Sequence, residues 1–299
     1  MGADGFAGFE TFETFDIATG GTTIHGVRGG EGPPVLLLHG IPETHLMWHR
    51  VAPALAERCT VVATDLRGYG ASGTPPSTAD HSPYGMREIA RDQVEVMRSL
   101  GFDEFAVVGH DRGARCAYRL ALDHPSAATR LAVLDVVPTG DAFARADARF
   151  SLGYWVWSFL AAPEPVPEQM ILAAPDVIVG HMLDAWSDDP GAVPPELRAE
   201  YVDRFRNPAT VHAICEEYRA AATVDVAHDE ADRAAGRRIA CPTLVLWSAT
   251  GALAAWYDPL ALWRPWVAAD LQGHSLPCGH FLPEEAPTEV TTALLDLLT

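Results

Sequence analysis

Gly109-His110-Asp111-Arg112-Gly113 decides the fold of this 299-residue chain. The stretch follows the apolar run from Phe105 to Val108 and precedes a helical pattern from Gly113 to Asp123, so it connects a strand to a helix. A sharp strand-to-helix turn needs small residues on both sides of its centre, and it lifts the central side chain above the sheet near the positive end of the helix. The stretch therefore predicts a nucleophile elbow with Asp111 at its centre.

A carboxylate at an elbow restricts the chemistry that the elbow can perform. The usual occupant is Ser, and a carboxylate cannot replace it as the acyl-transfer nucleophile of an ordinary esterase. It can attack an sp³ carbon, displace a leaving group and form an ester with the substrate. An Asp that follows a strand is also a common helix N-cap, so the assignment of Asp111 depends on the partners found elsewhere in the chain.

His280 is the base that hydrolysis of such an ester requires. It lies in Cys278-Gly279-His280-Phe281, after the last expected strand, Leu271 to Leu276, and before the last expected helix, Glu284 to Leu298. The other histidines lack this context. An imidazole with a pKa near ~6.5 is suited to deprotonate water. We therefore expect His280 to activate the water that cleaves the ester.

Two acids are candidates to orient His280. The loop Ser248 to Gly251 follows the expected strand Thr243 to Trp247, where an acid could orient His280, but it contains neither Asp nor Glu. Asp135 ends the apolar run Leu131 to Leu134, and a carboxylate there can reach the same imidazole from a neighbouring strand end. Asp258, in the helical stretch after the empty loop, is the rival. The pattern favours Asp135 and leaves Asp258 open.

Backbone and side-chain donors are expected around Asp111. Ile41, in the turn His39 to Pro42, and Arg112, directly after the nucleophile, should contribute the N–H groups of an oxyanion hole. Arg112 and Arg115 are three residues apart at the start of a helix, so both side chains can lie beside Asp111. Two guanidiniums there would bind a substrate carboxylate, although each arginine alone could equally form a structural salt bridge. The pair predicts a small anionic organic substrate.

Apolar runs alternate with helical patterns on both sides of the elbow. Thr11 to Val27 is typical of two strands joined at a Gly20-Gly21 turn. Further short apolar runs are typical of strands buried in a parallel sheet: Pro34 to His39, Thr60 to Asp65, Phe105 to Val108, Leu131 to Val137, Thr243 to Trp247 and Leu271 to Leu276. This order predicts an α/β fold with a mostly parallel sheet flanked by helices. Helical segments without a strand fill the interval 139–238, so we expect a core of residues 1–138 and 239–299 with an inserted helical cap.

Composition excludes several kinds of partner and site. The formal net charge of −19 makes nucleic acid and an anionic membrane surface poor partners. No apolar run approaches the ~20 residues of a membrane span, and residues 1–17 lack the pattern of a secretory signal, so we expect a cytoplasmic protein. Five scattered cysteines predict neither a disulfide framework nor a zinc site. No metal and no cofactor is expected.

Together these motifs resemble those of the fluoroacetate dehalogenases, also called haloacetate dehalogenases, of the α/β-hydrolase superfamily. The likeness covers nearly the whole chain and is carried by seven stretches: His39 to His45, Asp65 to Gly70, Gly109 to Arg115, Leu134-Asp135, Trp157 to Leu160, Cys215 to Arg219 and Gly279 to Pro283. The first two are shared widely with epoxide hydrolases. The resemblance implies Asp111 as nucleophile, His280 as base, Asp135 as its partner, Arg112 with Arg115 as a carboxylate clamp, and a homodimer.

The resemblance also implies a halide pocket in the cap. In the family, a His-Trp pair and a Tyr donate hydrogen bonds to departing fluoride, and the matching positions here are Val156, Trp157 and Tyr218. Trp186 is either a further wall of this pocket or a core residue. Val156 departs from the family pattern because an isopropyl group donates no hydrogen bond, and fluoride needs donors more than chloride or bromide does. The expected substrates are therefore chloro- and bromoacetate, and defluorination stays open.

Two other functions compete with this one. An epoxide hydrolase shares the Asp nucleophile and the His base but needs cap tyrosines to protonate the opening ring, and Tyr218 with Tyr154 or Tyr201 could supply them. The arginine pair argues against a neutral epoxide. A small-molecule binding protein that has lost catalysis is the second alternative, and the intact Asp111 and His280 argue against it.

Overall fold

A computed structural model describes residues 6–298, so the first five residues of the expected core, and Thr299, lie outside the described residues. Its centre is an eight-stranded sheet in the order β1-β2-β4-β3-β5-β6-β7-β8. The strands are β1 (Glu13–Ala18), β2 (Thr23–Gly29), β3 (Pro34–Leu38), β4 (Thr60–Thr64), β5 (Phe105–His110), β6 (Ala128–Leu134), β7 (Thr243–Ser248) and β8 (Leu271–Leu276). β2 pairs antiparallel with β1 and β4, and all other pairings are parallel. The mostly parallel sheet is confirmed.

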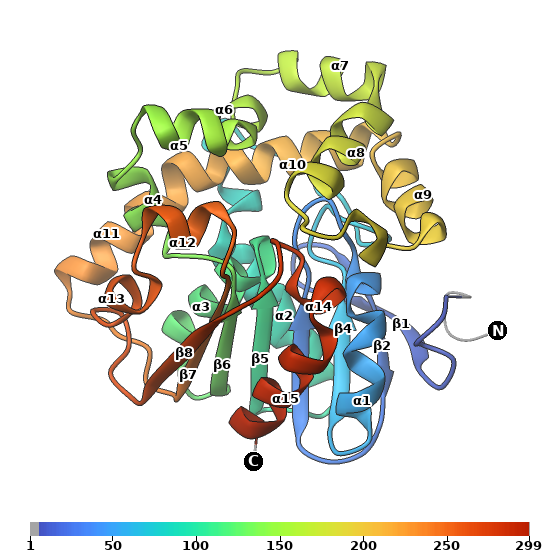
Figure 1. Ribbon diagram of the computed structural model, residues 1–299, viewed down its shortest axis with the longest axis vertical. Coiled ribbons are helices and arrows are strands. Elements are labelled where there is room, and N and C mark those ends of the chain that lie inside the picture. The colour runs from blue at the N-terminus through green and yellow to red at the C-terminus, as the bar shows by residue number, and fades with distance from the viewer. Residues whose placement is uncertain (1–5, 299) are drawn as a thin grey trace.

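Helices cover both faces of the sheet (Figure 1). On one face, α2 (Met86–Ser99) packs against α3 (Arg112–Asp123). The opposite face carries α1 (Ala52–Ala56) and α15 (Pro287–Leu298). Shorter elements lie in the connections: η2 (His45–Arg50), η3 (Ser82–Tyr84), α12 (Ala252–Trp256), α13 (Pro259–Trp263) and α14 (Leu282–Glu285).

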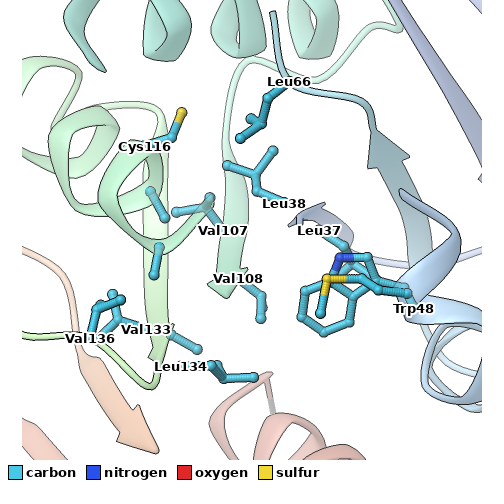
Figure 2. Packing of buried hydrophobic residues seen from close by; sticks show 14 of the residues in the cluster. Leu37, Leu38, Trp48, Leu66, Val107, Val108, Cys116, Val133, Leu134 and Val136 are labelled. Carbon is cyan, nitrogen blue, oxygen red and sulfur yellow. The ribbon is translucent and has the colours of Figure 1, made fainter. Parts of the chain in front are cut away.

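The central strands are apolar throughout because both of their faces are covered. Leu37 lies opposite Val108 in the β3–β5 register, and the next residue of each strand points to the other face of the sheet. Figure 2 shows Leu38 and Val107 turned toward Cys116 of α3, whereas Leu37 and Val108 point the other way. All five side chains are fully buried. A strand in this position cannot alternate between apolar and polar residues, which explains the continuous apolar runs of the sequence.

A helical insertion separates β6 from β7 and lies above one edge of the sheet (Figure 1). It consists of α4 (Thr139–Ala144), α5 (Ala148–Gly153), α6 (Trp155–Leu160), α7 (Val166–Ala173), α8 (Pro175–Ala185), η4 (Pro190–Ala192), α9 (Pro195–Arg204), α10 (Pro208–Ala220), the π-helical η5 (Ala221–Asp225) and α11 (Val226–Ala234). Residues 139–238 contain no strand. The division into a core and a separate cap domain stays a prediction.

The cysteines and the helices agree with two further expectations. All five cysteines are buried and free, with no disulfide among them. Among the helices of residues 6–298, none combines the length and the apolar character that crossing a membrane would require.

Candidate active site

Asp111 lies at a crowded turn between β5 and α3. Its φ of 46° and ψ of −113° are unusual for a residue with a side chain. A Cβ on Gly109 would lie 2.2 Å from the Gly113 carbonyl oxygen, and a Cβ on Gly113 would lie 2.3 Å from the Leu38 carbonyl oxygen. The two glycines therefore allow strand and helix to meet closely enough to hold the Asp111 carboxylate on the wall of a cavity.

His280 lies between two carboxylates. Its Nδ1 is 2.6 Å from Asp135 Oδ2, and its Nε2 is 4.0 Å from Asp111 Oδ2. Asp135 Oδ1 accepts a second hydrogen bond, 2.9 Å long, from the Ser248 backbone N–H, which fixes the orientation of the carboxylate. The rival acid, Asp258, caps the start of α13 instead. The structure thus brings Asp111, His280 and Asp135 together and leaves Asp258 outside the group.

The positive charge of His280 and the negative charges of Asp111 and Asp135 stabilise one another. Burial alone would lower the pKa of His280, but its hydrogen bond with Asp135 and the two carboxylate charges outweigh burial, so the pKa lies above 6.5. Burial would also raise the pKa of Asp111, but the positive charges of His280 and Arg112 outweigh it and lower this pKa below its usual value. A carboxylate that stays ionised is the form that can act as a nucleophile.

Backbone N–H groups surround the Asp111 carboxylate. The Ile41 N–H donates to Asp111 Oδ1 over 3.1 Å. A Cβ on Gly40 would lie 2.6 Å from the Cβ of Asp111, so the turn can approach the nucleophile only because residue 40 is glycine. Arg112, the second expected donor, is the first residue of α3, where N–H groups have no acceptor within the helix. The Ile41 N–H thus contacts the Asp111 carboxyl group directly, and the Arg112 N–H is free of an acceptor within the helix.

A cavity of about 280 Å³ adjoins Asp111 and His280. The residues that line it from the insertion include Tyr154, Val156, Trp157, Trp186 and Tyr218. All four residues expected in the halide pocket are therefore found on this wall. Tyr154 and Tyr218 bring hydroxyl groups and Trp157 brings an indole N–H group to this wall, whereas Val156 brings only methyl groups.

Arg115 brings a positive charge to the same cavity. Its guanidinium lies over the Trp157 ring, 4.5 Å from the ring centroid. Its Nη1 donates to the Val137 carbonyl over 3.1 Å and to Thr139 Oγ1 over 3.0 Å, which fixes the side chain in place. Arg115 is thus positioned and charged to bind an anion beside Asp111.

Arg112 lies behind the cavity rather than on its wall. The side chain is fully buried, and its Nε donates to Glu217 Oε1 over 2.9 Å. The guanidinium also lies 4.4 Å from the centroid of the Tyr218 ring. Arg112 therefore forms a structural salt bridge with Glu217, which was the alternative to binding a substrate carboxylate. Its Nη1 and Nη2 groups remain without an acceptor in the described residues.

The cavity also contains residues that the sequence does not mark as part of a halide site, among them Tyr154, Asp188 and Thr250. Asp188 lies in a short polar loop whose position depends on tertiary packing, so nothing local to the sequence marks it. Tyr201, the other tyrosine proposed for an epoxide hydrolase, is fully buried on α9 and is not among the residues that line the cavity.

A group with metal-ligand chemistry lies away from this cavity. His25, His45 and Asp65 offer atoms within 4.8 Å of one another. Asp65 accepts hydrogen bonds from the His45 backbone N–H, His45 Nδ1 and the Ala71 N–H, and His25 Nδ1 lies 2.9 Å from Asp16 Oδ1. Both Asp65 oxygens are thus engaged, and His25 binds Asp16 of β1, so these residues form hydrogen bonds within the protein.

Comparison with known proteins agrees with this architecture. Residues 33–287 match the family model described as alpha/beta hydrolase fold. The chain is 42% identical to a fluoroacetate dehalogenase from Burkholderia sp, over 98% of this chain and 95% of that protein. It is 31% identical to a soluble epoxide hydrolase from Corynebacterium sp. (strain C12), over 92% and 93%.

A solved structure shows the same fold. The "putative alpha/beta hydrolase" of Nostoc sp PCC 7120 is 50% identical, with a TM-score of 0.94 over 96% of this chain and 98% of that one. The chain therefore belongs to the α/β-hydrolase superfamily and, within it, to the fluoroacetate dehalogenase family, and it is a hydrolase.

Proposed function

We propose that this hydrolase cleaves the carbon–halogen bond of small 2-halo carboxylates, such as chloro- and bromoacetate, through an ester on Asp111. The observation that carries the proposal is the Arg115 guanidinium on the wall of the cavity that also holds the Asp111 carboxylate. A cation beside a nucleophile suited to sp³ carbon fits a substrate that is both an anion and an alkyl halide. The similarity to a fluoroacetate dehalogenase supports the same substrate class.

The first step forms the ester. Arg115 binds the substrate carboxylate, and an oxygen of Asp111 attacks the carbon that bears the halogen. The new C–O bond forms as the carbon–halogen bond breaks, and the halide leaves with the electron pair. Asp111 Oδ2 is the better placed oxygen because Oδ1 is held by the Ile41 N–H. The helical insertion acts as a cap that covers this reaction.

The second step hydrolyses the ester. His280 Nε2 takes a proton from water, and the resulting hydroxide attacks the carbonyl carbon of the Asp111 ester. The oxyanion receives hydrogen bonds from the Ile41 and Arg112 N–H groups, and Asp135 stabilises the imidazolium. The alkoxide then leaves with the proton from His280, which releases a 2-hydroxy acid, and the Asp111 carboxyl group loses the proton of the added hydroxyl to solvent, which restores the carboxylate.

The donors available to the leaving halide favour chloride and bromide. Trp157 and Tyr218 line the cavity and can donate through an N–H and an O–H group, and Val156 lines the same cavity without a donor. Fluoride concentrates its charge more than the heavier halides and depends more on such donors. Defluorination is therefore expected to be the slowest of the three haloacetate reactions.

A second candidate function has one observation in its favour. Tyr154 and Tyr218 both line the cavity, and burial raises the pKa of both hydroxyls, so both carry a proton at neutral pH. Two such hydroxyls could protonate the oxygen of an opening epoxide. Arg115 has no part in that reaction, so we place epoxide hydrolysis second.

The decisive experiment combines a substrate panel with a trapped intermediate. Halide release from fluoro-, chloro- and bromoacetate is measured beside the opening of a set of epoxides. His280→Gln should still form the ester but fail to hydrolyse it, so intact-protein mass spectrometry should show one added carboxymethyl group after incubation with chloroacetate. The exposed His274 provides the control, since His274→Gln should remain unmodified and active. An unmodified His280→Gln protein that releases halide repeatedly would disprove the assigned mechanism.

A further inference from the structure

The loop that carries His280 lies against a loop of the helical insertion. Residues 186–189 follow α8, residues 278–281 follow β8, and about ninety residues of sequence separate them. The His280 backbone N–H donates to the Trp186 carbonyl over 2.8 Å. The Trp186 ring meets the His280 imidazole edge to face, with 5.6 Å between the centroids. A wall of the cavity and the expected base are therefore in direct contact.

Glu285 joins the same two loops through its carboxylate. Glu285 Oε2 accepts from the backbone N–H groups of Asp188 at 2.8 Å, Gly279 at 3.0 Å and Asp189 at 3.2 Å. Glu285 Oε1 accepts from the Phe281 N–H at 3.0 Å. Two of these donors belong to each loop. Hydrogen bonds to an ionised acceptor are about twice as strong as neutral ones, so this carboxylate is a strong bridge between the loops.

Gly279 shows how closely the loops fit. A Cβ on this residue would lie 2.5 Å from the Asp188 nitrogen and 2.8 Å from the Trp186 carbonyl oxygen. Gly279 is not in the left-handed region, so its conformation alone does not demand glycine. The close approach of residues 186–188 does demand it.

A third contact lies at the same junction. Thr250 Oγ1 donates to Asp188 Oδ2 over 2.6 Å. Thr250, Asp188, Trp186 and His280 all line the cavity. The contacts between the two loops therefore lie at the boundary of the reaction space itself.

We propose that Glu285 is a positioning residue that holds the Trp186 wall and the His280 loop together as one unit. Without its carboxylate, four N–H groups would lose their acceptor. Water can satisfy each of them separately, but water cannot tie one loop to the other. The imidazole would then lose its fixed place relative to the ester, and the Trp186 wall would move away from the cavity. The kinetic part of the test rests on the proposed function, whereas the structural part does not.

The structural test is amide hydrogen exchange, followed by mass spectrometry, on the wild type, Glu285→Ala, Glu285→Gln and Glu289→Ala. Glu289 is an exposed glutamate in the first turn of α15 and serves as the matched control. Glu285→Ala should speed exchange in segments 186–189 and 279–281 by roughly tenfold or more, because the lost bonds are charge-assisted. Glu285→Gln keeps one acceptor oxygen and should show a smaller increase, and Glu289→Ala should match the wild type.

The kinetic test compares the two half-reactions in the same proteins. If His280 loses its position, Glu285→Ala should release a burst of chloride from chloroacetate and then turn over slowly, with ester accumulating on the protein. The Trp186 wall should also exclude larger substrates less strictly, so turnover of 2-chloropropanoate should rise relative to turnover of chloroacetate. Partial recovery of both properties is expected in Glu285→Gln.

Two results would overturn the proposal. One is exchange in segments 186–189 and 279–281 that does not change in Glu285→Ala. The other is exchange that rises equally in β5 and α3, because this would show a general loss of stability rather than a local separation. If the wild type turns over none of the halo acids, the proposed function fails, while the exchange comparison still decides the role of Glu285.

Discussion

The contact between Asp135 and His280 controls the protonation of the base. The hydrogen bond and the charge of Asp135 keep the pKa of His280 above 6.5. Only the neutral imidazole can take a proton from water, so ester hydrolysis should increase as the pH rises through this pKa. Asp135→Asn removes the charge, and the pKa of His280 should fall.

The expected result is an acid limb of the kcat profile that moves to lower pH in Asp135→Asn, while the plateau drops by roughly 10²–10⁴ because the imidazolium loses its partner. The measurement is kcat against pH for the wild type and the variant. An acid limb that stays in place, or moves to higher pH, would show that Asp135 does not set the protonation of His280.

Val156 is the residue at which halide preference can be tested. Val156→His should raise fluoroacetate turnover relative to chloroacetate turnover, because it adds a donor beside Trp157 and Tyr218. A well-placed donor of this kind contributes roughly 10²–10³ in rate. We expect less here, because the imidazole must fit a site shaped around valine. Val156→Leu is the control for shape, and an unchanged ratio in Val156→His would place the halide elsewhere.

Local sequence was sufficient to predict that Asp111 and His280 lie together, because each has a strong local signature. Asp111 is flanked by glycines that the crowded turn requires, and His280 follows the last strand. The choice between Asp135 and Asp258 depends on which strand end faces His280, so it could be favoured from the sequence but not decided. Arg112 illustrates the limit, because its partner Glu217 lies on α10, more than a hundred residues away.

At the level of elements, α3 carries two arginines with different surroundings. Arg115 lines the cavity, whereas Arg112 pairs with Glu217 in the interior. Arg115→Met keeps an unbranched side chain but removes the guanidinium and its charge. It should weaken the turnover of haloacetates far more than that of uncharged alkyl halides, and it should do so mainly through KM.

Arg112→Met should behave differently because it leaves Glu217 buried without its partner. Removal of one member of a buried ion pair typically costs about 3–5 kcal/mol, so this variant should lose stability as well as activity. Thermal unfolding and steady-state kinetics of both variants separate the two effects. Equal losses with charged and uncharged substrates in Arg115→Met would mean that Arg115 has a structural role.

The boundaries of elements were less predictable than their order. The apolar run Leu131 to Val137 predicts a strand to residue 137, but β6 ends at Leu134 because Asp135 takes a φ of 54°. Val136 and Val137 are buried in the following loop, so their apolar character reflects burial and not a strand. The last expected helix is two helices, α14 and α15, because Ala286 leaves the helical conformation, with φ of −132° and ψ of 52°, before Pro287.

At the level of the whole molecule, two buried glutamates join distant parts of the chain beneath the site. Glu43 follows β3 and Glu284 lies in α14, and both are almost fully buried. Burial raises the pKa of Glu43 to about 8, although its interaction with the neighbouring Glu284 lowers it in part. The folded protein therefore holds a proton that the unfolded chain releases near pH 4.5.

This difference makes stability depend on pH. Between pH 4.5 and about 8, the folded state binds more protons than the unfolded state, so the stability contributed by neutral Glu43 is lost as the pH rises. The slope is at most about 1.4 kcal/mol per pH unit for one proton. Glu43→Gln should show a shallower fall in the free energy of unfolding from pH 5.5 to 7.5. Denaturant titrations at several pH values measure this free energy, and the exposed Glu57→Gln variant is the control. Equal slopes in the wild type and Glu43→Gln would contradict the raised pKa of Glu43.

The sequence could not predict which distant segments of the chain contact each other. The alternation of strands and helices was enough to predict the mostly parallel sheet flanked by helices. The contact of residues 186–189 with residues 278–281 depends on how the insertion folds back over the sheet, and no local pattern encodes it.

The crowding around Asp111 has a consequence for how such enzymes diversify. Gly40, Gly109 and Gly113 each lie where a Cβ would come within 2.6 Å of another atom, so none of them can accept a side chain without rebuilding the turn. This crowding restricts the three glycines and not the identity of the side chain at residue 111. Exchange of the nucleophile at that position would therefore not by itself require a remodelled backbone.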